Sequence, residues 1–259
     1  MATALITGAT AGIGAAFARL LAARGNDLIV VSRDEKRLTA TAAELAEAHG
    51  VDVRPVAADL TDDADCATVA THAAEVDLLV NNAGMALRKG FTYNDLSDEE
   101  RILNLNVRSV LRLTHAALPA MAGRGRGAIV NVSSVAGFAP TSPNSTYGAG
   151  KAWVTNFSQS LAPVAREDGV RVMALCPGFV RTEFHERAGI DMSGTPGWML
   201  MDADFVAETA MRDLLRGKTV SVPSFTYKLI VSGIRHIPLN WWPTLATQGS
   251  KVMRRGYSR

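Results

Sequence analysis

The 259 residues suffice for one large α/β domain or two small ones. Hydrophobic residues make up 47% of the chain and charged residues 20%, a balance that excludes a disordered chain and is typical of a soluble globular protein. The formal net charge of +2, from 27 basic and 25 acidic residues, is too balanced to indicate a nucleic-acid partner.

Metal-binding and secretory signals are also lacking. Cys66 and Cys176 form no CxxC motif, and two cysteines are too few for a disulfide framework. The five histidines show no metal-ligand spacing, so we expect no metal site. The first residues do not resemble a signal peptide, and no run of 18 apolar residues occurs. We therefore expect a cytoplasmic protein without a membrane-spanning helix.

Short apolar runs of strand length recur along the chain, and we predict strands at 4–7, 28–32, 51–57, 78–81, 128–133, 170–175 and 219–222. They lack polar alternation, as strands buried on both faces of a parallel sheet do. Between them, 15–24, 35–49 and 147–167 have amphipathic helical patterns. This alternation predicts a Rossmann-like, doubly wound parallel sheet of about seven strands with helices on both faces. Ligands are expected at the edge where the strands end.

No linker rich in proline and serine divides the chain. We therefore predict one domain. Residues 1–222 should form its dinucleotide-binding and catalytic part, including a substrate loop at 183–201. Residues 223–259 should form a C-terminal helical extension of the same domain.

A glycine-rich turn directly follows the first predicted strand, with glycines at Gly8, Gly12 and Gly14. Gly8 permits a tight exit from the strand, Gly12 lets the backbone approach a pyrophosphate, and Gly14 lets the next helix pack against the sheet. That helix then presents its N–H groups and positive dipole end to the phosphates. The GxxxGxG spacing departs from the general GxGxxG pattern, but its place favours cofactor binding over a purely structural turn.

The end of the second predicted strand indicates which cofactor is bound. Ser32 stands where NAD-preferring folds carry an acidic residue, and Arg33 follows it. An arginine suits the 2′-phosphate of NADP, whereas an acid bonds the 2′-hydroxyl of NAD. Asp34 is expected to cap the next helix. We therefore predict NADP(H), with a solvated loop charge as the alternative interpretation of Arg33.

Several motifs in a fixed order resemble the short-chain dehydrogenase/reductase family, over roughly residues 2–182. They are the glycine loop, Asp59 after the third strand, NNAG at 81–84, NLNV at 104–107, Ser133-Ser134, YxxxK at 147–151 and PGxxxT at 177–182. The resemblance implies a Rossmann-like fold and a nicotinamide cofactor. Ala11 departs from the pattern, because some NADP-dependent members carry a basic residue there.

The resemblance also implies which residues form the site. It assigns catalysis to Asn106, Ser134, Tyr147 and Lys151. The residues implied in cofactor binding lie in the loops after the strands and on the catalytic helix. They are Gly8, Thr10, Ala11, Gly12, Ile13, Gly14, Arg33, Asp59, Leu60, Asn82, Ala83, Gly84, Tyr147, Lys151, Pro177, Gly178, Val180 and Thr182. Within this set the segment at 177–182 covers the nicotinamide, whose carboxamide Thr182 bonds.

Tyr147 and Lys151 are four residues apart on a predicted helix, so both side chains can point into one site. An ammonium group beside a phenol favours the phenolate, which brings a tyrosine closer to the working range of a general acid/base. Tyr147 would donate a proton to a carbonyl oxygen in reduction and accept one from a hydroxyl in oxidation. The alternative is an amphipathic helix on which both residues only pack and solvate.

Two further polar residues are assigned by position. Ser134 precedes Tyr147 by the spacing seen in the family, and its hydroxyl can steady charge on the substrate oxygen. Ser133 is the alternative, and strand alternation allows only one of the two to face the substrate. Asn106 lies in a predicted helix, where asparagine is a poor helix former. The resemblance implies that it anchors a water linking Lys151 to solvent, against a surface amide as the alternative.

The variable region after Thr182 bears on the substrate. The loop at 184–201 is rich in apolar residues, which suggests a hydrophobic ketone or alcohol, and His185 is a candidate substrate contact. The stretch from 227 to 259 combines apolar residues, two tryptophans and a basic tail. It is expected to cover the substrate pocket, form a subunit interface or rest on a membrane surface as a peripheral contact.

The motifs together predict an NADP(H)-dependent oxidoreductase that interconverts a ketone and a secondary alcohol on a medium-sized or hydrophobic substrate. A non-catalytic protein of the same fold that binds or senses NADP(H) is the alternative. The resemblance further implies a homo-oligomer, a dimer or a tetramer.

Overall fold

The computed structural model describes residues 2–140, 145–184, 188–189 and 194–236. Within these residues seven parallel strands form one sheet in the order β3-β2-β1-β4-β5-β6-β7. The strands are β1 Thr3–Thr7, β2 Asp27–Ser32, β3 Val53–Ala57, β4 Leu78–Asn81, β5 Gly127–Val132, β6 Val170–Leu175 and β7 Val220–Ser221. The order runs outward from β1 in both directions, which confirms the predicted doubly wound, Rossmann-like sheet.

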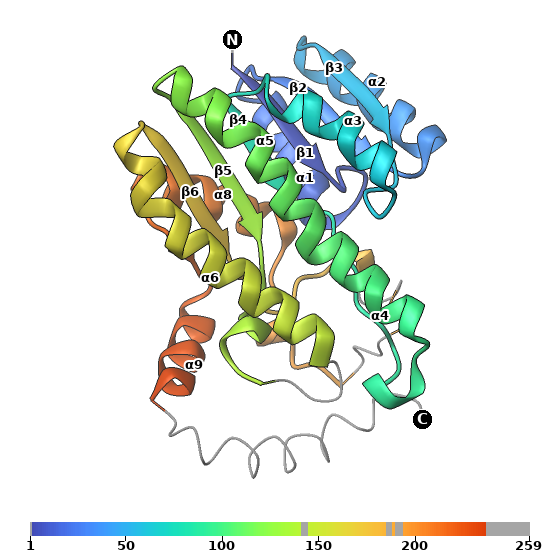
Figure 1. Ribbon diagram of the computed structural model, residues 1–259, viewed down its shortest axis with the longest axis vertical. Helices are drawn as coiled ribbons and strands as arrows, with labels where there is room; N and C mark the ends of the chain where they lie inside the picture. Colours follow the sequence, from blue (N-terminus) through green and yellow to red (C-terminus); the bar gives the residue numbers. More distant parts are fainter. Residues whose placement is uncertain (1, 141–144, 185–187, 190–193, 237–259) are drawn as a thin grey trace.

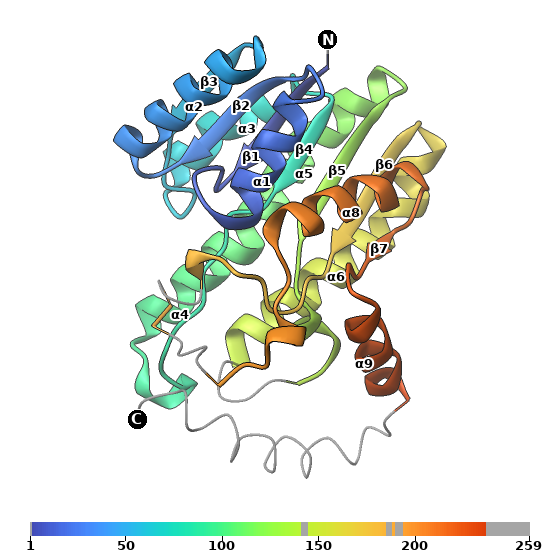
Figure 2. The ribbon, with the colours of Figure 1, turned by 180° about the vertical axis from the view of Figure 1, so that it is seen from behind.

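Helices cover both faces of the sheet, as predicted. The α-helices of the described residues are α1 Gly12–Ala22, α2 Glu35–His49, α3 Asp63–Ala73, α4 Leu96–Leu103, α5 Ser109–Gly123, α6 Ser145–Glu167, α8 Ala203–Leu215 and α9 Phe225–Arg235, of which α4 and α9 lie beyond the ends of the strands. Figure 1 shows α5 and α6 lying across the front of the sheet, and Figure 2 shows α1 and α8 across the back. The crossovers between parallel strands supply these two layers.

The central strands contribute side chains to two hydrophobic cores. On β1, Ile6 packs with residues of α1 and α8, whereas its neighbour Leu5 packs with residues of α3, α5 and α6. The same alternation holds on β2 for Val30 and Ile29. Successive side chains of a strand point to opposite faces, so a central strand with helices on both sides must be apolar throughout. This explains the unbroken apolar runs in the sequence.

Some boundaries differ from the predicted ones. The third strand begins at Val53 instead of residue 51, and it forms the outer edge of the sheet with largely exposed side chains. Pro55 is tolerated there because an edge strand does not need every N–H group for pairing. Helix α1 begins at Gly12, three residues earlier than predicted, so part of the glycine loop is itself helical. Asp34 caps α2 by accepting a hydrogen bond from the Arg37 amide at 3.0 Å, as predicted.

Beyond β7 the chain continues into α9, which packs with one side only. Tyr227 and Val231 are buried, whereas Phe225 and Leu229 are exposed. The proposed division of the domain at residue 222 stays a prediction, and the extension at 237–259 lies outside the described residues. In the described part of the chain, no helix combines the length and the apolar character that crossing a membrane requires.

Candidate active site

The site residues meet at the edge where the parallel strands end. Gly8 follows β1, Asn82 follows β4, Ser134 follows β5 shortly after its last residue, and Pro177 follows β6. In an open α/β sheet this carboxyl edge is where ligands bind, close to the point where the strand order reverses. In this sheet that point lies between β1 and β4.

The three glycines of the first loop are required by geometry. Gly8 and Gly12 have backbone φ angles of +67° and +54°, which side chains with a Cβ rarely adopt. A Cβ on Gly14 would overlap the carbonyl group of Gly8 and lie 2.5 Å from the side-chain nitrogen (Nδ2) of Asn82. Gly14 therefore lets α1 pack against its own loop and Asn82, which refines the expected contact with the sheet.

Thr7 holds this loop to the end of β4, a role that the sequence did not reveal. Its hydroxyl accepts hydrogen bonds from the backbone N–H groups of Asn82 and Ala83, both at 2.9 Å. The Asn82 side chain donates in return to the carbonyl oxygen of Thr7 at 2.8 Å. No local pattern marks Thr7, because a hydroxyl at a strand end is equally common in purely structural turns.

The N-terminus of α1 fits an anionic group. Its N-cap residue Ala11 makes no side-chain capping bond, and the first turn carries no acidic residue. A helix start without such caps presents N–H groups to an anion such as a pyrophosphate. Thr182 lies across this loop, since a Cβ on Gly12 would come within 2.9 Å of the Thr182 methyl carbon. The structure thus brings the loop after β6 against the glycine loop.

Arg33 lies at the end of β2 with its side chain 61% exposed. Its guanidinium is 3.9 Å from a carboxylate oxygen of Asp59, which Arg101 also approaches to 3.2 Å. Burial raises the pKa of Asp59, but hydrogen bonds from Thr61 and the charges of Arg33 and Arg101 outweigh it, so that the pKa lies below its usual value. Asp59 is therefore an ionised acceptor beside a cationic group. Leu60, the next residue, is buried.

Tyr147 and Lys151 lie together near the start of α6. The Lys151 ammonium nitrogen is 5.8 Å from the centre of the Tyr147 ring and donates a hydrogen bond to the carbonyl oxygen of Val132 at 2.8 Å. Lys151 is buried, and this desolvation lowers its pKa from 10.5 to about 8. Lys151 is therefore not solvated, and the alternative that it only packs stays open.

Asn106 lies in a π-helical turn, Asn104–Arg108, between α4 and α5. The sequence predicted an ordinary helix there, and π-bulges of this kind occur frequently at functional sites. The Asn106 amide is buried, donates to the carbonyl oxygen of Met85 at 2.8 Å and accepts from its N–H at 2.9 Å. The surface-amide alternative is therefore wrong. A Cβ on Gly84 would lie 3.2 Å from the Asn106 oxygen and 3.5 Å from the Lys151 nitrogen, so both groups adjoin Gly84.

The two serines after β5 point to different partners. The Ser133 hydroxyl is buried and bonds the carbonyl oxygen of Lys151 and the hydroxyl of Thr155, both at 2.7 Å. Ser134 is half-buried and accepts a hydrogen bond at 3.1 Å from the amide of Ala136, in the turn that follows. Ser133 thus supports the backbone of α6. Ser134 caps the turn that follows β5, and its contact with the substrate oxygen stays a prediction.

The loop after β6 is held from three sides. The carbonyl oxygen of Pro177 accepts a hydrogen bond from the Val135 amide at 3.0 Å, and Val180 forms an isolated parallel bridge with Met201. Tyr227 of α9 contacts the same loop, with its hydroxyl 3.0 Å from the Phe179 amide nitrogen. Burial raises the pKa of Tyr227, so its hydroxyl stays neutral. The sequence offered no motif for Tyr227, only its helical spacing from Val231.

Two residues at the start of the substrate loop contact helices α2 and α6. Glu183 makes a two-pronged ion pair with Arg37 of α2, at 2.7 and 3.0 Å. The Phe184 ring lies 6.2 Å from the Tyr147 ring, centre to centre, at an angle of 45°. The predicted substrate contact His185 lies outside the described residues, as do 186–187 and 190–193.

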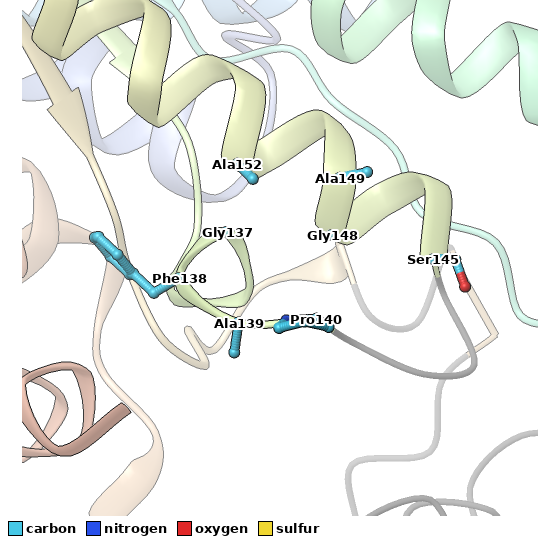
Figure 3. A pocket seen from close by; sticks show the side chains of 8 residues that line it. All are labelled: Gly137, Phe138, Ala139, Pro140, Ser145, Gly148, Ala149 and Ala152. Carbon is cyan, nitrogen blue, oxygen red and sulfur yellow. The ribbon is translucent and has the colours of Figure 1, made fainter. Parts of the chain in front are cut away.

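A cavity of about 460 Å³ opens beside this site (Figure 3). It is lined by Gly137, Phe138, Ala139, Pro140, Ser145, Gly148, Ala149 and Ala152. On α6 the spacing of 145, 148, 149 and 152 places these residues on one side of the helix. Tyr147 and Lys151 occupy another side, so this mostly apolar cavity flanks the Tyr147–Lys151 pair without containing it.

Comparison with known proteins agrees with this geometry. The family described as short chain dehydrogenase matches residues 2–192. A short-chain dehydrogenase from Sphingobium yanoikuyae, solved in complex with NADPH, is 38% identical with a TM-score of 0.83, covering 98% of this chain and 96% of that one. The bulky-bulky ketone specific alcohol dehydrogenase from Comamonas testosteroni is 32% identical with a TM-score of 0.79, covering 98% and 94%.

Among curated sequences, the very-long-chain 3-oxoacyl-CoA reductase of Anas platyrhynchos is 35% identical over 189 residues. The match covers 70% of this chain but 61% of that protein, so the chain spans less than two thirds of this relative's length. An oxidoreductase of Staphylococcus saprophyticus matches at 31% identity over 87% of this chain and 96% of its own length. From the family match and the shared fold, the chain belongs to the short-chain dehydrogenase family of oxidoreductases.

Proposed function

We propose that this oxidoreductase interconverts a ketone and a secondary alcohol with NADP(H), using Tyr147 as the general acid/base. The observation that supports the proposal is that three polar side chains, those of Asn106, Tyr147 and Lys151, lie near one another. Lys151 lies beside the Tyr147 ring, and both Lys151 and Asn106 adjoin Gly84. Burying a lysine and an asparagine costs free energy unless they are hydrogen-bonded, and here Lys151 bonds Val132 and Asn106 bonds Met85. A buried lysine whose pKa is lowered, at the ligand-binding edge of the sheet, is a candidate functional group.

The described residues fit NADP(H). The glycine loop and the uncapped start of α1 would hold the pyrophosphate, and Arg33 would bind the 2′-phosphate as an exposed cation. Asp59, Asn82 and the loop after β6 would border the rest of the cofactor. When bound, NADP(H) supplies or accepts the hydride. The Sphingobium relative was solved with NADPH, which supports the choice of cofactor.

The protein's own residues would manage the proton and the charge. The Tyr147 hydroxyl donates a proton to the carbonyl oxygen in reduction and takes the hydroxyl proton in oxidation. Ser134 donates a hydrogen bond to the same oxygen and stabilises its developing charge. Lys151 has a pKa of about 8, so below that pH it would carry a positive charge near the Tyr147 ring and favour the Tyr147 phenolate. Asn106 holds the backbone of Met85 next to Lys151.

The substrate proposed for this site is a medium-sized or hydrophobic ketone. The Phe184 ring lies 6.2 Å from the Tyr147 ring, so an apolar side chain borders the proposed acid/base. Apolar linings of this kind favour apolar ligands. The Comamonas relative is described as specific for bulky-bulky ketones, which is consistent with this class. We further propose that the protein works in the cytoplasm as a homo-oligomer.

The test is a titration with NADPH and NADH followed by nicotinamide fluorescence, and then a panel of hydrophobic ketones. We expect tighter binding of NADPH and ketone-dependent oxidation. Binding without turnover of any ketone would favour the non-catalytic alternative. Failure to bind either nucleotide would refute the proposal.

A matched pair of variants tests the role of Tyr147. Tyr147→Phe should reduce turnover by about 10²–10⁴-fold, the usual contribution of a general acid/base, while NADPH still binds. Tyr93→Phe is the control, because the Tyr93 side chain is 56% exposed and is not one of the predicted site residues. Turnover that survives in Tyr147→Phe would contradict the mechanism even if the protein reduces ketones.

A further inference from the structure

Tyr227 of α9 contacts the loop after β6 and the end of the substrate loop at once. We propose that Tyr227 is a positioning residue that holds these two segments in place over the nicotinamide half of the cofactor. The inference deepens the proposed function and rests on it, since it assumes a bound nicotinamide dinucleotide. It assigns a part in cofactor binding to a residue of the C-terminal extension, outside every motif in the sequence.

The aromatic ring accounts for a glycine. A Cβ built on Gly178 would overlap the Tyr227 ring, so a side chain at 178 and the ring at this position exclude each other. Gly178 has no positive φ angle, so its backbone conformation does not require a glycine. The close approach of the Tyr227 ring requires it instead. Gly178 and Tyr227 therefore act as a matched pair, one supplying the space that the other fills.

The hydroxyl joins two separate stretches of backbone. It accepts a hydrogen bond from the Phe179 amide at 3.0 Å and donates one to the carbonyl oxygen of Met199 at 2.9 Å. Two further bonds between the stretches run beside it, from Met201 N to Phe179 O and from Arg181 N to Met201 O, both at 2.9 Å. Tyr227 is only 3% exposed, so water is poorly placed to replace its hydroxyl.

This contact reaches the catalytic residues through the backbone. Pro177, next to Gly178, accepts a hydrogen bond from Val135, which directly follows Ser134. On the other side Thr182 lies against Gly12 of the glycine loop. A shift of the loop after β6 would therefore disturb the nicotinamide side of the site. The same segment reaches the adenosine side through the partly exposed ion pair of Glu183 with Arg37 of α2, which does not involve Tyr227.

The experiment compares two ligands in Tyr227→Phe, which keeps the ring and removes the hydroxyl. NADPH probes the whole cofactor site, and adenosine 2′,5′-bisphosphate probes the adenosine half without the nicotinamide. We expect the dissociation constant of NADPH to rise about tenfold, because two buried backbone groups lose their partner. The bisphosphate should bind within about twofold of wild type. Tyr93→Phe is the control and should change neither affinity.

Gly178→Ala provides an independent check, since it displaces the ring while leaving the hydroxyl in the sequence. Gly178→Ala should also weaken the binding of NADPH but not of the bisphosphate. Adding Tyr227→Phe to it should cause little further loss of NADPH affinity. Equal weakening of both ligands would indicate a merely structural role and overturn the inference, as would unchanged NADPH affinity in both variants. Wild-type protein that binds neither ligand would instead overturn the proposed function, and the inference with it.

Discussion

Burial of the Lys151 ammonium should make the active site a source of instability at neutral pH. The pKa of Lys151 falls from 10.5 to about 8 on folding, because the charged form is desolvated. Between these values the unfolded chain holds the proton and the folded protein does not. Stability therefore rises as the pH climbs from 8 to 10.5, and the full penalty applies below pH 8. Lys151→Met removes this penalty.

The magnitude follows from the pKa values. The full penalty corresponds to about 3 kcal/mol, which is an upper limit for a buried group. Lys151→Met also leaves the carbonyl oxygen of Val132 without its partner, which costs about 1–3 kcal/mol and offsets part of the gain. The loss of this hydrogen bond does not vary with pH, so it does not affect how the stability difference between wild type and variant changes with pH. Relative to the variant, wild type should gain about 1.3 kcal/mol between pH 7 and pH 9.

Urea unfolding of wild type and Lys151→Met at both pH values measures this difference. Lys36→Met is the control, because Lys36 is exposed on α2 and its replacement should cause the same small change at both pH values. The variant should also lose ketone reduction, which would separate the function of the lysine from its effect on stability. A stability difference between wild type and Lys151→Met that is equal at pH 7 and pH 9 would refute the reasoning.

Three further substitutions test the cofactor loops. Arg33→Ser should weaken NADPH binding about 10- to 100-fold by removing a charge-assisted contact, and change NADH binding by less than about threefold, as measured by fluorescence titration. Gly14→Ala should lower the melting temperature by more than about 4 °C and impair binding of both nucleotides, because its Cβ would overlap the Gly8 carbonyl. Glu183→Gln should shift the melting temperature by less than about 2 °C, since the ion pair with Arg37 is partly exposed. Nearly equal loss of NADPH and NADH in Arg33→Ser would exclude the phosphate contact.

The architecture was predictable because strands and helices leave local periodic signals. Apolar runs alternating with amphipathic stretches predicted the parallel sheet, and the side chains of β1 and β2 do pack alternately into two cores. The capping role of Asp34 was likewise local, as it depends on residues within one turn. The strand boundary at Val53 was missed, since an edge strand with exposed side chains lacks the apolar signal of the central strands.

Much of the candidate site was also predictable, since glycines at fixed spacings and the i, i+4 pair of Tyr147 and Lys151 belong to single segments. The sequence by itself therefore determined which segments form strands and helices and which motifs those segments carry. The tertiary structure decided how distant segments meet. Thr7 bonds the backbone of Asn82 across 75 positions, and Tyr227 bonds Phe179 across 48. Neither contact leaves a local trace, because it depends on the packing of helices and strands in space, and burial of Lys151 depends on that packing too.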